Sequence, residues 1–234
     1  VETDQETSLI QIVGKYIAKT GDKGILDEVV AGKTVSERIE LMIEYLMTER
    51  YNEEYGLLFG ARTADWGDVQ PYDDFGVDMN EHSFIAIDVY DNAMLIIALK
   101  YMQDMTEDAA KKERWQKLSA SIATNVRKHL WDDTKKKFIP HVYPGESPIP
   151  EGFNELDVYY HGGTAVAIEA GLLSKEEIAV VNAQMLENVR LSGMPSIGPT
   201  PYPVQPHAFF RGGMANPYVS QHGSHWTWFR GRRI

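Results

Sequence analysis

Hydrophobic residues recur with the spacing of α-helices along most of this chain. Six segments show this periodicity and are predicted to be helices: 8–20, 34–49, 83–102, 106–130, 163–172 and 174–190. At the start of two of these segments a Ser or Thr stands three residues before a Glu, as in a capping box: Thr34 with Glu37, and Ser174 with Glu177. The predicted buried stripe of the first helix comprises Leu9, Ile12, Val13, Tyr16 and Ile17.

Two kinds of helix alternate in this pattern. The helices that begin near residues 8, 83 and 163 are predicted to be buried, and segment 83–102 is apolar on almost every side. Each is followed by an amphipathic helix. Most turns within a pair are short, whereas the connections after each pair are long: 51–82, 131–161 and 191–223. This spacing indicates a repeated helical hairpin with its long loops at one edge.

The predicted fold is therefore all-α, with helical hairpins that form an α/α toroid or part of one. The long loops would gather over the N-terminal ends of the buried inner helices, where function is expected. Residues 1–234 are expected to form a single domain with about three hairpins and the start of a fourth. The connection 21–33, within the first pair, is interpreted as an ordinary exposed loop.

The first long loop holds the most informative motif, Asp65-Trp66-Gly67-Asp68. An aromatic ring can cover the apolar face of a sugar while a neighbouring carboxyl group transfers a proton. The alternative is an aspartate-rich turn in which Trp66 anchors the core. Further candidate binding residues in the three long loops are Arg62, Gln70, Tyr160, His161, His222, Trp226 and Trp228.

Asp88 and Asp91 lie three residues apart on segment 83–102, so they share one face of the predicted helix. A buried carboxylate is costly unless it is paired or hydrogen-bonded. We therefore expect these two side chains to accept backbone N–H groups or to pair with an arginine. Contact with a substrate in a central cavity is the alternative.

Four segments together resemble the six-hairpin glycosidases, the (α/α)6-toroid superfamily of glycoside hydrolases and disaccharide phosphorylases. The segments are 60–70 (GARTADWGDVQ), 90–94 (YDNAM), 161–165 (HGGTA) and 222–228 (HGSHWTW). The first looks like the Asp-Trp-Asn-Asp element of cellobiose-phosphorylase-like enzymes, in which the second aspartate is the general acid. The resemblance implies that Asp68 is the proton donor, with Asp65 beside it and Trp66 in the sugar-binding wall.

The resemblance implies cleavage of a glycosidic bond in a carbohydrate substrate, by an inverting hydrolase or by a phosphorylase. The base of a hydrolase could be Glu155 or Asp157, and in a phosphorylase phosphate replaces that base. Candidates to hold phosphate are Arg62, Arg211, His161 and His222. One alternative is a sugar epimerase or isomerase, in which His161 would face His222 or His225. The other is a truncated or non-catalytic domain that binds sugar or assembles.

The chain departs from the family pattern in two ways. A complete toroid has six hairpins, so the chain is expected to be a fragment or to form a homo-oligomer that completes the helical ring. Where the family has an Asn-Gly-Gly-(Asp)-Trp pattern, this chain has His222-Gly223-Ser224-His225-Trp226. An essential acid at that position would be missing.

The composition of the chain limits the kinds of partner that it is expected to bind. The formal net charge of −11 disfavours nucleic acid, because phosphate binding needs a basic surface. No apolar run approaches the roughly 18 residues of a membrane-spanning helix, so no membrane partner is expected. The lack of cysteine and of a basic signal-peptide region favours the cytoplasm. Without a His-Glu-x-x-His element, neither a metal nor another cofactor is predicted.

Overall fold

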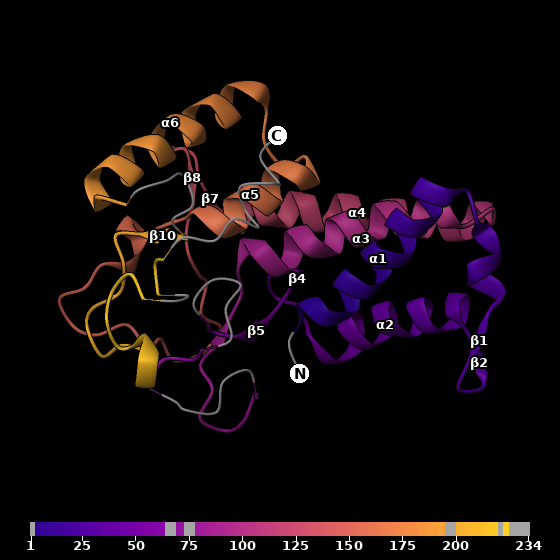
Figure 1. Cartoon of the computed structure of the whole chain (residues 1–234), viewed down its shortest axis with the longest axis horizontal. Coiled ribbons are helices and arrows are strands. Elements are labelled where there is room, and N and C mark those ends of the chain that lie inside the picture. Colours follow the sequence, from indigo (N-terminus) through magenta and orange to yellow (C-terminus); the bar gives the residue numbers. More distant parts are fainter. Residues whose placement is uncertain (1–2, 64–68, 73–77, 195–199, 220–221, 225–234) are drawn as a thin grey trace.

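The computed structural model describes residues 3–63, 69–72, 78–194, 200–219 and 222–224. In this part of the chain six α-helices form the frame, and the strands are short hairpin pieces (Figure 1). The helices are α1 (Asp4–Thr20), α2 (Val35–Glu49), α3 (Val89–Met105), α4 (Ala109–Leu130), α5 (His161–Ala170) and α6 (Lys175–Ser192). The prediction of a mostly helical fold is confirmed. None of the described helices has the length and apolar character needed to cross a membrane.

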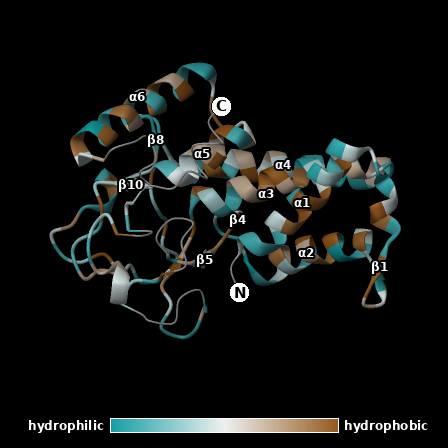
Figure 2. Ribbon diagram, viewed as in Figure 1, coloured by the Kyte–Doolittle hydropathy of each residue, from teal (hydrophilic) through white to brown (hydrophobic). Residues whose placement is uncertain are grey.

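Helix α3 is the centre of the frame. It contacts α1, α4 and α5, and residues 92–99 are buried without interruption, so every side of the helix is covered. Hydrophobic residues gather where α1, α3 and α4 pack together (Figure 2). By contrast, the outer helix α2 buries one face, made by Ile39, Ile43 and Leu46. The predicted difference between a buried and an amphipathic helix is confirmed for α3 and α2. It is wrong for α1, which was also predicted to be buried but is amphipathic, with Thr7, Ile10, Gln11, Gly14 and Ile17 as its buried residues.

The first helix turns a different face to the core from the one predicted. Gly14 lies so close to α3 that an added Cβ would be 2.4 Å from the ring of Tyr101. This contact directs Ile10 and Ile17 inward. The predicted stripe is therefore wrong at Leu9, Ile12 and Tyr16, which are 49%, 62% and 40% exposed.

Local signals place the starts of three helices. Thr34 Oγ1 accepts from the Glu37 N–H at 3.1 Å, and the Glu37 carboxylate accepts from the Thr34 N–H at 2.7 Å, so the predicted capping box is present. Ser174 and Glu177 form the second capping box. Asp88 caps α3 by accepting from the Asp91 N–H at 2.9 Å, as expected for this pair. The predicted start at residue 83 is wrong because Ile85–Ala86 forms strand β6 instead.

The two outer helices α2 and α4 lead into the same kind of hairpin. Strand β3 (Tyr51–Asn52) pairs with β4 (Leu57–Leu58), and β7 (Trp131–Asp132) pairs with β8 (Lys137–Phe138). Residues at matching places in the two turns, Gly56 and Lys136, are in the left-handed region at φ 64° and 49°. The hairpin repeat thus extends beyond the helices into the start of the first and second long loops.

Short pairings then bring the three long loops together. Strand β5 (Gly60–Ala61) pairs with β6, Ile87 bridges to Val142, and β9 (Tyr159–Tyr160) pairs with β10 (Pro201–Tyr202). The described parts of the loops lie at the end of the molecule where α3 begins (Figure 1). The connection 21–33 was predicted as a plain loop but contains η1 (Lys23–Asp27) and a small hairpin, β1 (Val29–Val30) with β2 (Lys33–Thr34).

Candidate functional site

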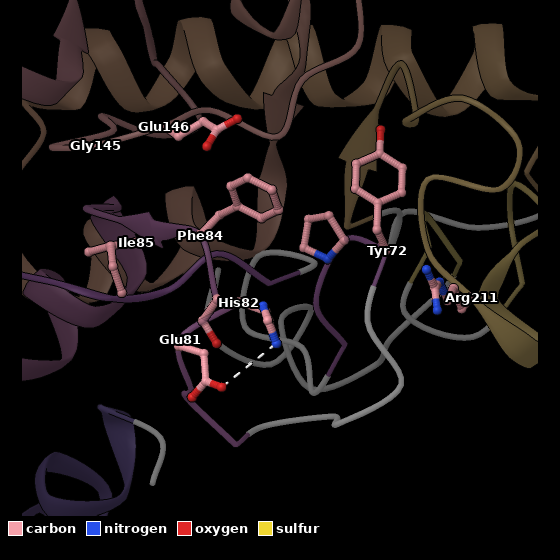
Figure 3. A pocket seen from close by; sticks show the side chains of 10 residues that line it. Tyr72, Glu81, His82, Phe84, Ile85, Gly145, Glu146 and Arg211 are labelled. Atoms are coloured by element: carbon pink, nitrogen blue, oxygen red, sulfur yellow. Dashed lines mark ion pairs between the residues drawn. The ribbon is translucent and has the colours of Figure 1, made fainter.

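A cleft of about 740 Å³ opens among the three long loops. Its lining comes from residues 71–72 and 81–85 of the first loop, 145–146 of the second and Arg211 of the third. In the view of Figure 3, Tyr72 and Arg211 lie across the cleft from Glu81 and Ile85, with Phe84 between them. The walls combine aromatic rings with two exposed carboxylates, those of Glu81 and Glu146. Such a mixture suits a small polar ligand that also has an apolar face.

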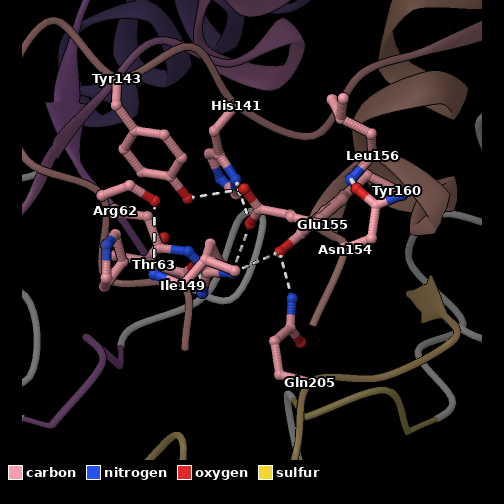
Figure 4. A network of polar contacts seen from close by, with 12 residues as sticks. Arg62, Thr63, His141, Tyr143, Ile149, Asn154, Glu155, Leu156, Tyr160 and Gln205 are labelled. Carbon is pink, nitrogen blue, oxygen red and sulfur yellow. Dashed lines mark hydrogen bonds and ion pairs between the residues drawn. The ribbon is translucent and has the colours of Figure 1, made fainter. Parts of the chain in front are cut away.

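Behind this cleft lies a buried network of polar side chains centred on Arg62 and Glu155 (Figure 4). Arg62 Nη2 donates to Glu155 Oε1 at 3.0 Å and to the Tyr160 hydroxyl at 3.1 Å. His141 Nδ1 lies 3.0 Å from the same Glu155 oxygen, and Tyr143 donates to Glu155 Oε2 at 2.8 Å. Glu155 is the first residue of η2 (Glu155–Asp157), so a short helix from the second loop receives the arginine of the first.

The electrostatics of this network keep Glu155 ionised. Burial raises the pKa of Glu155, but His141 and the Arg62 guanidinium outweigh burial and lower it to about 2. For Tyr143, burial together with Glu155 raises the pKa, so the phenol keeps the proton that it donates. Glu155 therefore has no proton to give at neutral pH, and both its oxygens are already occupied by partners.

The network continues into the third loop. Gln205 donates to the Tyr160 hydroxyl at 2.8 Å. The Arg62 guanidinium lies over the Phe209 ring at 4.7 Å and over the Phe210 ring at 5.4 Å. Phe209 in turn meets the Tyr72 ring edge to face at 5.3 Å. The buried network and the cleft wall thus share Phe209.

The structure brings together Arg62, Glu155 and Tyr160 from the predicted site. Gln70 is also buried, and it donates to the Asp78 carbonyl of the same loop at 2.8 Å. Asp157 lies apart, exposed on the surface, where Lys135 pairs with it at 3.0 Å. None of these five lines the cleft.

The two predicted histidines of the described chain are both buried. His161 begins α5, and its Nε2 lies 3.0 Å from the Asn188 amide of α6. His222 lies between the Met214 carbonyl, 2.9 Å from Nδ1, and the Gln205 carbonyl, 3.0 Å from Nε2. Burial lowers the pKa of His222 in spite of these carbonyl groups, which raise it. Both rings are thus engaged within the protein.

Five of the predicted site residues lie outside the described part of the chain: Asp65, Trp66, Asp68, Trp226 and Trp228. Their proposed roles rest on the sequence. The described residues nearest the first motif in sequence are Thr63 before it and Val69 after it. Within the described ranges, no three histidine or acidic side chains come together in a way that could hold a metal ion.

Several site residues were not among the candidates from sequence. His141, Tyr143 and Gln205 complete the network, and Tyr72, Glu81 and Glu146 line the cleft. The matching hairpins after α2 and α4 were a usable signal, because Arg62 and His141 follow them at nearly equivalent positions. The cleft residues carry no such signal in the sequence.

Comparison with protein-family models found no match for this chain, and neither did comparison with curated proteins.

Proposed function

We propose that this chain is a carbohydrate-active enzyme of the six-hairpin glycosidase type, which cleaves a glycosidic bond with Asp68 as proton donor. The cleft is the observation that supports this proposal most directly. Pro71 and Tyr72, which follow Asp68 closely in sequence, form part of its wall. Aromatic rings pack on the apolar face of a sugar, and carboxylates accept hydrogen bonds from its hydroxyl groups.

The proposal places the base of an inverting hydrolase in the same cleft. Acid and base of such an enzyme are roughly 6.5–9.5 Å apart, with room for a water molecule between them. Glu155 is occupied by Arg62, His141 and Tyr143, and Asp157 is on the outer surface. Among the described carboxylates, Glu81 and Glu146 line the cleft, and we propose that one of them is the base.

A phosphorylase would hold phosphate in place of the base, and the structure separates the residues proposed for that role. Arg62 is fully buried and bonded to Glu155 and Tyr160, and His161 and His222 are engaged inside the fold. Arg211 lines the cleft. We therefore assign phosphate binding, if phosphate is the attacking group, to Arg211.

The toroid arrangement belongs to the same proposal. Helices α1, α3 and α5 would be successive inner helices, since α3 contacts both of the others. Helices α2, α4 and α6 would form the outer layer. An epimerase would instead need paired histidines facing the substrate, and the burial of His161 and His222 favours the glycosidase.

Turnover of a glycoside panel tests the proposal. We expect hydrolysis or phosphorolysis of one class of p-nitrophenyl glycoside or disaccharide, assayed with and without inorganic phosphate. Asp68→Asn should lower turnover at least 100-fold, because general acid catalysis contributes about 10²–10⁴-fold. Glu53→Gln, a matched loss of an exposed carboxylate in the β3–β4 turn, should leave turnover unchanged.

Solution mass is measured beside these assays, since the ring is proposed to be completed by a second chain. Full activity of Asp68→Asn would rule out its role as proton donor. Sugar binding without turnover, in every oligomeric state, would instead establish the non-catalytic alternative. Glu81→Gln and Glu146→Gln are made separately, and the substitution that abolishes hydrolysis identifies the base.

A further inference from the structure

Tyr72 has an unusual backbone for a bulky residue. Its φ is 58°, in the left-handed region that residues with a large side chain rarely adopt. A glycine would adopt this conformation without strain. Strained residues persist where the surrounding structure holds them, and they cluster at ligand-binding sites.

Contacts from the other two long loops hold Tyr72 in this conformation. Its N–H donates to the Phe209 carbonyl at 3.0 Å, and its hydroxyl donates to the Pro148 carbonyl at 3.3 Å. The ring meets the Phe209 ring at 68° with centroids 5.3 Å apart. Phe209 is itself fixed from behind by the Arg62 guanidinium. The position of the Tyr72 ring is therefore determined by all three loops.

Despite these anchors the ring is not buried. Tyr72 is 39% exposed and lines the cleft, whereas Phe209 behind it is 1% exposed. Phe209 is buried behind Tyr72, so Tyr72 is the member of this aromatic pair that reaches the cleft. A strained and rigidly held aromatic residue that is partly exposed to a cleft is a prepared surface for a ligand.

We propose that Tyr72 is the platform on which the apolar face of a pyranose ring packs, and that the ligand is an uncharged sugar. The assignment of the ligand class rests on the proposed function. Charge supports it: the lining has the carboxylates of Glu81 and Glu146 against the guanidinium of Arg211 and the His82 imidazole, whose Nε2 lies 3.8 Å from Glu81 Oε1. The chain as a whole carries a net charge of −11. An anionic sugar would be repelled, whereas neutral hydroxyl groups can donate to both carboxylates.

Direct binding measurements test this platform independently of turnover. The probes are the methyl pyranosides of glucose, galactose, mannose and xylose, with methyl glucuronide as the charged counterpart, in calorimetry and saturation-transfer NMR. Tyr72→Ala should weaken binding of the preferred neutral pyranoside about tenfold, since it removes the apolar surface that the sugar covers. Tyr72→Phe keeps the ring and should stay within about twofold of the wild type.

Two further variants separate the platform from a structural role. Tyr72→Gly relieves the backbone strain, so its melting temperature should equal or exceed that of Tyr72→Ala while sugar binding is lost. Leu41→Ala is the matched control: Leu41 is 43% exposed on α2 and does not line the cleft, so its removal should leave sugar binding unchanged.

The outcomes for the platform and for the glycosidase are distinct. If the wild type turns over a glycoside and folded Tyr72→Gly has the same KM, Tyr72 is not the sugar platform, whereas the glycosidase proposal stands. If the wild type binds a pyranoside, Tyr72→Gly abolishes that binding, and no glycoside is turned over, the glycosidase proposal is wrong and the assignment of Tyr72 as the sugar platform stands. Absence of pyranoside binding by the wild type, or tighter binding of the glucuronide than of the glucoside, would overturn this inference.

Discussion

At the scale of single residues, Glu155 joins two of the long loops through a buried ion pair. Its partner Arg62 lies 93 positions away in sequence, and the Arg62 side chain is fully buried. If one member of a buried pair is removed, the other remains as an uncompensated charge. The stability of the loop end of the molecule should therefore depend on this single carboxylate.

We expect Glu155→Gln to lower the free energy of unfolding by about 3–5 kcal/mol, measured by urea denaturation at pH 7. The pKa of Glu155 is lowered from 4.5 to about 2 in the folded chain. The stabilisation is therefore fully present above pH 4.5 and is lost as the pH falls through about 2. This pKa shift corresponds to a loss of about 3 kcal/mol in the free energy of unfolding between these pH values. The pH profile of Glu155→Gln should not show this loss.

Asp157→Asn is the matched control for this prediction. Asp157 ends the same short helix η2, but it is exposed and pairs only on the surface with Lys135. Its neutralisation should leave the free energy of unfolding close to that of the wild type, because solvent screens an exposed ion pair. Equal losses in the two variants would contradict a special role for the buried pair.

At the scale of secondary-structure elements, Gly14 sets the rotation of α1 by its contact with Tyr101. Helix propensity alone favours Gly14→Ala by about 1 kcal/mol. The added Cβ would lie 2.4–2.7 Å from three Tyr101 atoms, including Cβ, and overpacking of this kind costs about 1–3 kcal/mol. We therefore expect a net loss of stability and a lower melting temperature.

The exposed Ala18 in the same helix provides the comparison. Ala18→Gly should lower stability by about 1 kcal/mol through propensity alone. A higher melting temperature for Gly14→Ala would show that α1 does not approach α3 as closely as the structure has it.

The sequence was informative about elements and much less so about their faces. The two capping boxes predicted where α2 and α6 start, and the apolar character of segment 83–102 predicted that α3 is buried on most sides. The buried face of α1 was not predictable, because it follows from a contact with α3 rather than from the periodicity of α1 itself. Ile10 and Gly14 look no more buried in sequence than Leu9 and Ile12 do.

The same limit applies to the candidate site. Arg62, Glu155 and Tyr160 were all recognised as loop residues with suitable chemistry. Their mutual contacts were not predictable, since the bridge between Ile87 and Val142 and the register of β9 with β10 bring the loops together. Likewise, the sequence around Tyr72 gives no sign of a left-handed tyrosine, which arises only from contacts with the other loops.

At the scale of the whole molecule, the outward face of α1 is an apolar stripe made by Leu9, Ile12 and Tyr16. Contiguous exposed apolar surface of this kind marks an interaction site. A second copy of the chain packed against this stripe would cover it. We expect the protein to self-associate in solution.

Ile12→Lys should reduce this self-association, measured by light scattering over a concentration series, without changing the melting temperature by more than a few degrees. Ile12 is 62% exposed, so the lysine causes no clash inside the monomer. Leu156→Lys, at a 51% exposed residue of η2, is the control and should associate as the wild type does. A wild-type chain that is monomeric at every concentration would contradict the expectation.

The twin hairpins after α2 and α4 have a consequence for how this architecture tolerates change. Each begins within two residues of the end of its helix and has the same register, in which Tyr51 pairs with Leu58 and Trp131 pairs with Phe138. The two turns nevertheless share little sequence. The hairpin is thus repeated, while the two loops that leave it are joined to each other by the buried Arg62–Glu155 pair. A loop grafted between β4 and α3 or between β8 and α5 would therefore have to keep its member of this pair.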